Sequence, residues 1–262
     1  MLCVTLDMTE AIATRATPMN CITTINHVGA GIGLQTRTIT RGAEADLVTE
    51  FIDFYCSRFL RRKKTRHLAV FIEPRIESGF PDIVFAHYEP VYSDSWNEAR
   101  GQLEVADLKV LSYLIQARGA EGRDIVAKLG LPENRTMRSL ENLLDARWIV
   151  RSGRLWQPRG LRSHFGLRRL EAIEAKIDAI GKAAGQALAN TWFASHSYAL
   201  TATATPRQAT LDSLTRLGLG LYCRDRGFRK HLEPMARALP SSYASLLFNE
   251  WVGRAVTRHP AA

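Results

Sequence analysis

The segment 170–177, LEAIEAKI, constrains the fold of this chain most, because apolar and polar residues alternate over its second part, residues 173–177. Alternation with a period of two is typical of a strand, on which successive side chains point to opposite faces of a sheet. Ile173 and Ala175 would then lie on one face, and Glu174 and Lys176 would lie together on the other. An acid and a base side by side on a largely apolar strand call for a partner or a function.

Two further apolar runs predict a pair of strands earlier in the chain. Residues 67–73 read HLAVFIE and residues 82–88 read DIVFAHY, and both are rich in the residue types that strands favour. Pro74 and Pro81 bound the connection between the runs and predict a turn there. Asp82 therefore stands at the start of the second strand, directly after a proline.

The remaining segments outside residues 101–160 alternate between helix and strand. Apolar residues at helical spacing predict helices over 43–60, 178–190 and 206–217, and short apolar runs predict strands over 197–202 and 217–222. Residues 228–258 are expected to form helices that pack on the core or form a dimer face. The alternation predicts the α/β class.

Residues 101–160 have a pattern of their own, in which helices are followed by a hairpin. A first helix ends at Gly119, a second spans 120–129, and a third begins near Asn134. The inward-facing residues of the third helix would be Met137, Leu140 and Leu144. Two short strands then flank a tight turn at 151–154. The order of these elements over residues 103–158 resembles a winged helix-turn-helix domain.

This resemblance implies a DNA-binding surface on the third helix and on the hairpin. Asn134, Arg135 and Arg138 would lie at the end and on the face of the helix that meet a major groove. Arg151 and Arg154 on the hairpin would reach a neighbouring phosphate strand. The alternative use of such a domain is to dock a partner protein.

The larger order of elements is helix, strand, strand after Pro-Asp, strand with Glu-x-Lys, helix, strand. This order resembles the PD-(D/E)XK nuclease superfamily, and the resemblance implies the restriction-endonuclease-like fold, a mixed sheet with helices on both of its faces. The resemblance implies that Asp82 and Glu174 bind a divalent metal, Mg²⁺ or Mn²⁺, and that Lys176 stabilises charge on the attacking water and the phosphate. A glutamine on the following helix supports the site in several branches of the superfamily, and Gln186 matches it.

An acid from the first helix sometimes completes the metal site in this superfamily. Glu50 is the expected residue here, and Glu44, Glu73 and Glu77 are alternatives. The residue types also suit the chemistry in their own right, because Mg²⁺ prefers carboxylate oxygens and keeps several water ligands. A bound metal lowers the pKa of its water, and a neighbouring ammonium group adds fixed positive charge.

The two expected metal-binding strands are close in sequence in most members of the superfamily, whereas here residues 101–160 lie between them. We interpret residues 43–100 and 161–262 as the nuclease-like core and residues 101–160 as an inserted DNA-binding domain. Residues 1–42 lack a sustained hydrophobic period and receive no assignment.

The charge balance favours a polyanion as the partner. The chain has 35 Lys and Arg residues against 26 Asp and Glu residues, a formal net charge of +9. No apolar run is long enough for a transmembrane helix, the N-terminus lacks a signal-peptide pattern, and the four cysteines form no CxxC pair. We therefore expect a soluble, cytoplasmic protein that binds DNA and not membranes, with a homodimer left open.

Together these features predict a metal-dependent DNA endonuclease, a phosphodiester hydrolase that acts in restriction, defence or repair. The alternative is a protein of the same fold that has lost activity and serves as a DNA-binding regulator or a protein-docking module. The presence of Asp82, Glu174 and Lys176 favours the enzyme.

Overall fold

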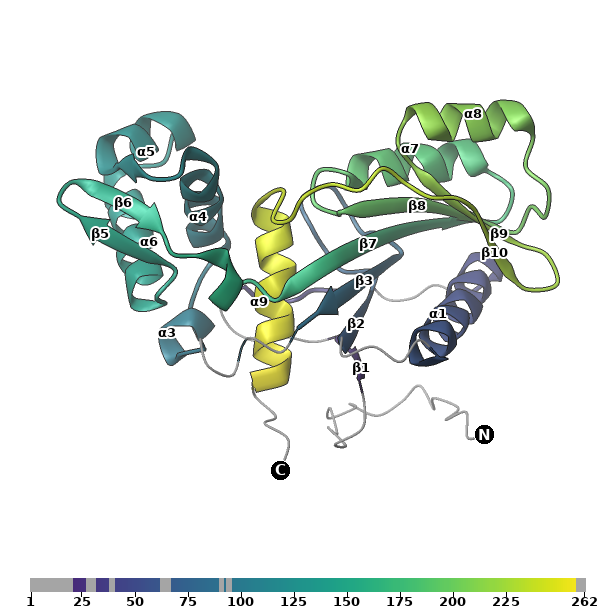
Figure 1. The fold of residues 1–262 in the computed structure, drawn as a ribbon, viewed down its shortest axis with the longest axis horizontal. Coiled ribbons are helices and arrows are strands. Elements are labelled where there is room, and N and C mark those ends of the chain that lie inside the picture. The colour runs from purple at the N-terminus through teal and green to yellow at the C-terminus, as the bar shows by residue number, and fades with distance from the viewer. Residues whose placement is uncertain are drawn as a thin grey trace.

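The computed structural model describes residues 21–26, 32–37, 41–61, 67–89, 92 and 96–257. Within them the chain forms an α/β fold with a seven-stranded mixed sheet, a three-stranded sheet and eight α-helices. Figure 1 shows a sheet lobe built on the large sheet and a helical lobe built around the small one, with α9 (Tyr243–Thr257) between them. None of the described helices is long and apolar enough to cross a membrane.

The large sheet combines antiparallel and parallel pairs. Its strands in spatial order are β1 (Ile22–Thr24), β2 (His67–Ile72), β3 (Ile83–Tyr88), β7 (Leu167–Lys176), β8 (His196–Thr201), β9 (Gly220–Arg224) and β10 (Phe228–Leu232). The β2–β3, β3–β7 and β9–β10 pairs are antiparallel, and the β1–β2, β7–β8 and β8–β9 pairs are parallel. The strands predicted over 67–73, 82–88, 170–177 and 197–202 are confirmed.

The prediction of a helix that begins at residue 228 is wrong, because β10 occupies residues 228–232. Phe228 packs its ring against Phe51 and Phe54, at centroid distances of 5.1 and 5.4 Å. This packing and the pairing with β9 outweigh the local helical spacing. The charged residues of β10 lie at the edge of the sheet, where charge discourages pairing with another chain.

Helices cover both faces of the large sheet, as the sequence predicts. They are α1 (Ala43–Arg61), α7 (Ile180–Asn190) and α8 (Gln208–Arg216). Leu47 and Phe51 of α1 are buried with the side chains of β2, β3 and β7. Ala183 and Ala187 of α7 are buried with the side chains of α8, β8 and β9, on the other side of the sheet (Figure 1). The sheet is therefore closed to solvent on each face by apolar helix surfaces.

The helical lobe places a small antiparallel sheet beside four helices. Its elements are α3 (Glu98–Gly101), α4 (Val105–Ala117), β4 (Ala120–Glu121), α5 (Gly122–Leu129), α6 (Glu133–Asp145), β5 (Ile149–Ser152) and β6 (Leu155–Pro158), and its strands lie in the order β4-β6-β5. A 3-10 turn, Leu161–Ser163, leads from it to β7. The helices and the hairpin predicted for residues 101–160 are confirmed as secondary structure.

One face of α6 differs from the expected one. Leu140 is buried as predicted, but Met137 and Leu144 are 36% and 39% exposed, and Leu143 is buried instead. Ser139 on the buried face donates a 2.6 Å hydrogen bond to a carboxylate of α4. This polar anchor and the leucines at positions 140 and 143 fix the rotation of α6, which a count of apolar residues alone does not reveal.

A fully buried ion pair joins the helical lobe to α9. Arg100 donates through Nε and Nη2 to both carboxylate oxygens of Glu250, at 2.8 and 2.7 Å, and through Nη2 to the carbonyl oxygen of His164 at 2.7 Å. The rings of Trp96 and Trp148 lie 4.8 and 4.7 Å from the guanidinium carbon. Each charged group is thus compensated in the interior, which makes the burial of both tolerable.

The opposite side of α9 belongs to the core of the sheet lobe. The rings of Phe248 and Trp251 pack against Phe71 of β2, at centroid distances of 5.1 and 5.9 Å. Asn249 accepts hydrogen bonds from the hydroxyl of Tyr92 and the backbone N–H of Gly166, at 3.0 and 2.9 Å. α9 therefore contributes to both lobes at once.

We expect Glu250→Ala to lower the free energy of unfolding by about 3–5 kcal/mol, because it leaves the Arg100 guanidinium buried without a carboxylate. Glu50→Ala removes an exposed ion pair with Arg224 and should cost less than about 1 kcal/mol. Urea-induced unfolding measures both changes. Similar losses in the two variants would contradict the role assigned to the buried pair.

Candidate functional site

The pairing of β3 with β7 brings two acids together that are distant in sequence. Ile83 of β3 lies opposite Ile173 of β7, so that Asp82 lies beside the strand segment that contains Glu174. The backbone N–H of Ala175 donates a 2.7 Å hydrogen bond to Asp82 Oδ2, across 93 positions of sequence. The adjacency of these two predicted strands is therefore confirmed.

Glu174 is a buried carboxylate with one unsatisfied oxygen. Only 3% of the residue is exposed, and Oε1 accepts a 2.6 Å hydrogen bond from Nδ2 of Asn190. Oε2 is also buried and has no hydrogen-bond partner among the described residues. Burial and the negative charge of Asp82 raise the pKa of Glu174 to about 8. A buried acceptor of this kind is suited to a cation or a donor from outside the described residues.

The Asp82 carboxyl also has a raised pKa. Burial raises the pKa of Asp82, and the hydrogen bond from Ala175 and the charge of Lys176 oppose this only in part. The raised pKa values of Asp82 and Glu174 show that the nearby positive charge does not fully offset the burial of the two carboxylates.

Lys176 lies on β7, two residues after Glu174, and its ammonium group is already held by an acid. Lys176 Nζ donates a 2.8 Å hydrogen bond to Glu44 Oε2. Burial alone would lower the pKa of Lys176, but this bond and the nearby carboxylates outweigh burial, and the pKa is raised. The lysine therefore stays charged beside Asp82 and Glu174, which we call the acid pair.

The acid that α1 brings to this region is Glu44 and not the expected Glu50. Glu50 instead forms a 2.8 Å ion pair with Arg224 of β9. The two acids are nearly two helical turns apart, which separates them by roughly 9 Å along the axis. Glu44 lies in the first turn of α1, close enough to Asp82 to raise the pKa of that carboxyl.

The two remaining alternatives lie in the connection between β2 and β3. Glu73 binds Arg37, whose Nε lies 2.5 Å from Glu73 Oε2, and its backbone N–H donates to the carbonyl oxygen of Asp82 at 3.1 Å. Glu77 is bound by the hydroxyl of Tyr243 and lies 3.2 Å from Lys109 Nζ. Glu73 is thus beside the acid pair, whereas Glu77 joins the connection to α4 and α9.

The helix residue that touches the site is Asn190 and not Gln186. Gln186 is exposed on α7, whereas Asn190 is buried and donates to Glu174. Asn190 continues the buried stripe of Ala183 and Ala187, at spacings of four and then three residues. A polar residue on the apolar face of a helix is the sequence signal that identifies it.

The carboxylates of Asp82 and Glu174 are suitable ligands for a hard divalent cation. Among the described residues, no group of three or more His, Cys, Asp or Glu side chains is arranged to hold a metal ion. Mg²⁺ is commonly bound by one or two carboxylates together with waters and substrate phosphate oxygens. The free Oε2 of Glu174 beside Asp82 satisfies that requirement.

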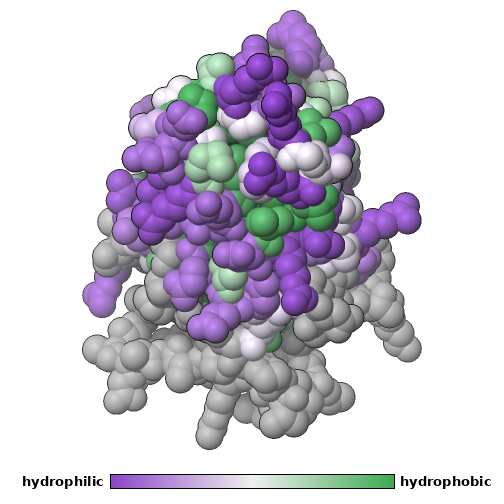
Figure 2. Space-filling view, turned by 90° about the vertical axis from the view of Figure 1, so that its left-hand side faces the viewer, coloured by the Kyte–Doolittle hydropathy of each residue, from purple (hydrophilic) through white to green (hydrophobic). Residues whose placement is uncertain are grey.

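The predicted DNA-binding residues fall into engaged and exposed groups. Arg135 lies 2.5 Å from Glu104, and Arg151 packs over the ring of Trp156 at 5.0 Å. Asn134 accepts a 2.7 Å hydrogen bond from the backbone N–H of Arg135. Arg138 and Arg154 are exposed, and their side chains form no hydrogen bond or ion pair within the described ranges. Figure 2 shows that hydrophilic residues cover most of this end of the molecule, around smaller apolar areas.

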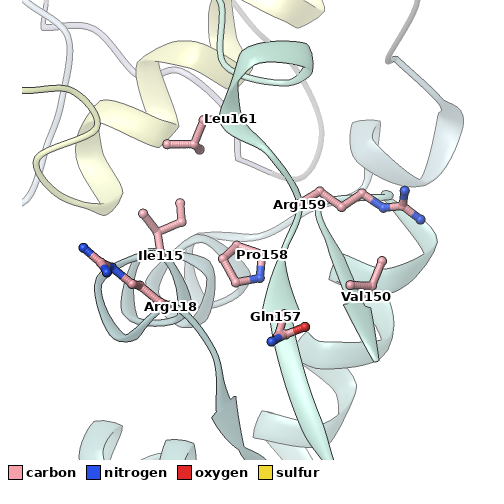
Figure 3. A pocket seen from close by; sticks show the side chains of 7 residues that line it. All are labelled: Ile115, Arg118, Val150, Gln157, Pro158, Arg159 and Leu161. Carbon is pink, nitrogen blue, oxygen red and sulfur yellow. The ribbon is translucent and has the colours of Figure 1, made fainter. Parts of the chain in front are cut away.

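A separate cleft of about 400 Å³ lies between the end of α4 and the β5–β6 hairpin. Its lining consists of Ile115, Arg118, Val150, Gln157, Pro158, Arg159 and Leu161, with none of the predicted site residues. Figure 3 shows that Arg118 and Arg159 extend in different directions from the apolar floor. The cleft is distinct from the acid pair.

We expect the stability of the protein in EDTA to fall as pH rises from about 4.5, the ordinary pKa of a glutamate, to about 8, the pKa of Glu174. In this window the folded chain holds a proton that the unfolded chain has lost, and above it the loss of stability is complete. Each unit of pKa difference is worth roughly 1.4 kcal/mol. Glu174→Gln, which keeps the neutral form, should flatten this slope and raise stability at pH 8.5.

Thermal and urea unfolding at pH 5, 6.5 and 8.5 check this expectation. Asp212→Asn on the exposed face of α8 is the matched control and should follow the wild-type curve. A Glu174→Gln protein whose stability declines as steeply as that of the wild type would show that Glu174 is ionised in the folded state.

The chain was also compared with known proteins. A scan against protein-family models found no match to the chain, and searches of curated proteins and of solved structures found none either.

Proposed function

We propose that the protein is a metal-dependent DNA endonuclease of the PD-(D/E)XK type. The observation that carries the proposal is the pairing of the partly buried Asp82 with the buried Glu174, of which one carboxylate oxygen has no partner among the described residues. Lys176 lies two residues further along the same strand and remains charged. Two carboxylates that could hold a metal ion, together with an ammonium group, suit metal-assisted hydrolysis of a phosphodiester.

The order of elements around the pair supports this proposal. α1, β2, β3, β7, α7 and β8 follow one another in the order that the superfamily resemblance implies, once the helical lobe is set aside. β3 and β7 are antiparallel neighbours, and β7 runs parallel to β8 across α7. Such a core is consistent with a restriction-endonuclease-like fold.

The roles of the side chains follow from their positions. Asp82 and Glu174 would hold Mg²⁺ or Mn²⁺, which supplies a water of lowered pKa and neutralises charge on the phosphate. Asn190 orients Glu174 through its hydrogen bond to Oε1, and Glu44 holds the ammonium group of Lys176. Lys176 stabilises the charge that develops as the water oxygen attacks phosphorus and the bond to the leaving oxygen breaks.

The helical lobe would act as the DNA-binding module. Three helices followed by a hairpin, with strands in the order β4-β6-β5, agree with the arrangement of a winged helix-turn-helix domain. Arg138 on α6 and Arg154 in the hairpin turn present exposed guanidinium groups suited to base edges and phosphates. This lobe would bring duplex DNA to the acid pair of the sheet lobe.

One observation favours a different function. The described residues contain no three-ligand metal group, and both Glu44 and Glu73 are bound to basic side chains. A protein that uses the fold as a DNA-binding regulator or a docking module would tolerate these pairs. Cleavage assays distinguish such a regulator or docking module from a nuclease.

We expect the purified protein to cut plasmid and linear DNA with Mg²⁺ and not with EDTA. Asp82→Ala and Glu174→Ala should each lower the cleavage rate by a factor on the order of 10² or more, because each removes a group that stabilises the transition state. Asp212→Ala on α8 should cut at the wild-type rate. Wild-type cleavage by Glu174→Ala would exclude the acid pair as the active site.

The double variant Arg135→Ala, Arg138→Ala should bind duplex DNA more weakly, since each good base contact is worth roughly 1–3 kcal/mol. The exposed ion pair of Arg135 with Glu104 adds little to folding, so the thermal midpoint should stay close to that of the wild type. Gel-shift titration measures the affinity, with Arg216→Ala on α8 as the control. Unchanged affinity would favour protein docking by the helical lobe.

A further inference from the structure

Arg37 belongs to the N-terminal part of the chain, for which the sequence pattern indicates no function. Short backbone pairing places it next to the connection between β2 and β3. The backbone N–H of Arg37 donates to the carbonyl oxygen of Glu73 at 3.2 Å, and that of Arg75 donates to the carbonyl oxygen of Gln35 at 2.7 Å. Thr36 forms a β-bridge with Pro74. Residues 35–37 are thereby fixed along residues 73–75.

The guanidinium of Arg37 lies at the rim of the acid pair. The Nε of Arg37 is bound to Glu73, and the guanidinium carbon Cζ lies 5.7 Å from the centre of the Phe80 ring. The hydrogen bond with Glu73 raises the pKa of Arg37 most, and the charges of Asp82 and Glu174 raise it further. Arg37 is therefore within electrostatic range of both acids of the proposed metal centre.

Glu73 is held in an unusual backbone conformation. Its φ is +45°, in a region that residues other than glycine seldom adopt. The bond from its N–H to Asp82 and the bond from Arg37 to its carbonyl oxygen fix the backbone on both sides. Strain of this kind is retained where the surrounding structure requires a side chain in one place, and functional sites are common examples.

The exposure of the two side chains differs in a way that suggests their roles. The Arg37 side chain is 52% exposed, whereas the Glu73 side chain is 11% exposed. The hydrogen bond from the side chain of Arg37 that the described residues show uses Nε. The outer Nη nitrogens of the planar guanidinium are then available to an acceptor that arrives from solvent.

We propose that Arg37 binds a phosphate group of the nucleic acid at the acid pair, and that Glu73 positions Arg37 and is not a metal ligand. This inference rests on the proposed nuclease function. A phosphodiester that approaches two carboxylates meets repulsion, and the single ammonium group of Lys176, one donor of which is bound to Glu44, offsets only part of it. A guanidinium whose Nε is fixed by a carboxylate presents a fork that matches phosphate oxygens.

A salt series tests the phosphate contact without catalysis. We expect Arg37→Gln to bind duplex DNA more weakly in EDTA and to lower the slope of log K against log salt by about 0.9, the value for one lost phosphate contact. Arg37→Lys keeps the charge and should restore the slope. Arg75→Gln is the matched control, because Arg75 lies on the same pairing and binds Gln35 through its side chain at 2.8 Å. Its slope should equal that of the wild type.

A double-mutant cycle tests the role of Glu73. Arg37→Gln should lower kcat/KM in Mg²⁺ by about tenfold to a hundredfold, as expected for a hydrogen bond to a charged group. Glu73→Gln should lower kcat/KM in the wild-type background and have no further effect in the Arg37→Gln background. Losses that multiply would assign Glu73 to the metal and overturn its positioning role. Thermal melts of each variant confirm that it is folded.

The outcomes separate this inference from the function on which it rests. A wild-type protein that neither binds nor cuts DNA overturns the nuclease proposal. A wild-type protein that does both, together with an Arg37→Gln variant that has the wild-type slope and the wild-type kcat/KM, overturns only the phosphate contact of Arg37. A reduced slope for Arg37→Gln beside an unchanged slope for Arg75→Gln supports it.

Discussion

The pairing of β3 with β7 is the constraint on which the rest of the molecule depends. The chain leaves β3 at Tyr88, builds the whole helical lobe, and returns to β7 at Leu167, the residue that pairs with Tyr88. The backbone N–H of Glu89 donates to the carbonyl oxygen of Gly166 at 3.0 Å, which extends the contact past the strands. Because the chain leaves and re-enters the sheet at adjacent points, the lobe can be present without disturbing the register that joins Asp82 to Glu174.

Two buried glutamates show how differently this molecule treats interior charge. Glu250 has both oxygens bound by Arg100, whereas Glu174 has one oxygen bound by Asn190 and one left without a partner among the described side chains. The first arrangement compensates the charge fully and serves packing. The second leaves a deficit of positive charge at a fixed place, which costs stability and is characteristic of sites that bind or react.

The alternation of residue types was enough to predict the main strands, and it placed Glu174 and Lys176 on one face of β7. The proline before Asp82 located the start of β3. The resemblance to the superfamily suggested Gln186 on the next helix, but the rotation of α7 turns Asn190 toward Glu174 instead. The pairing of residues 35–37 with residues 73–75 is too short to produce a period, so Arg37 had no signal in the sequence.

Glu44 and Glu50 show that the contacts of a helix packed across a sheet are also hard to predict from sequence. Both acids lie on α1, and only the position of the helix over β7 and β9 decides which basic residue each one meets. The sequence restricts the choice to acids of one helix, and tertiary packing selects among them.

The position of α9 has a consequence for the order in which the chain acquires its structure. α9 follows every other described element, yet Phe248 and Trp251 complete the core beneath β2, and Glu250 neutralises Arg100. Until this helix has left the ribosome, the apolar surfaces of both lobes lack their common partner. The core of each lobe is therefore complete only after α9 has been synthesised, and until then these apolar surfaces are exposed to aggregation.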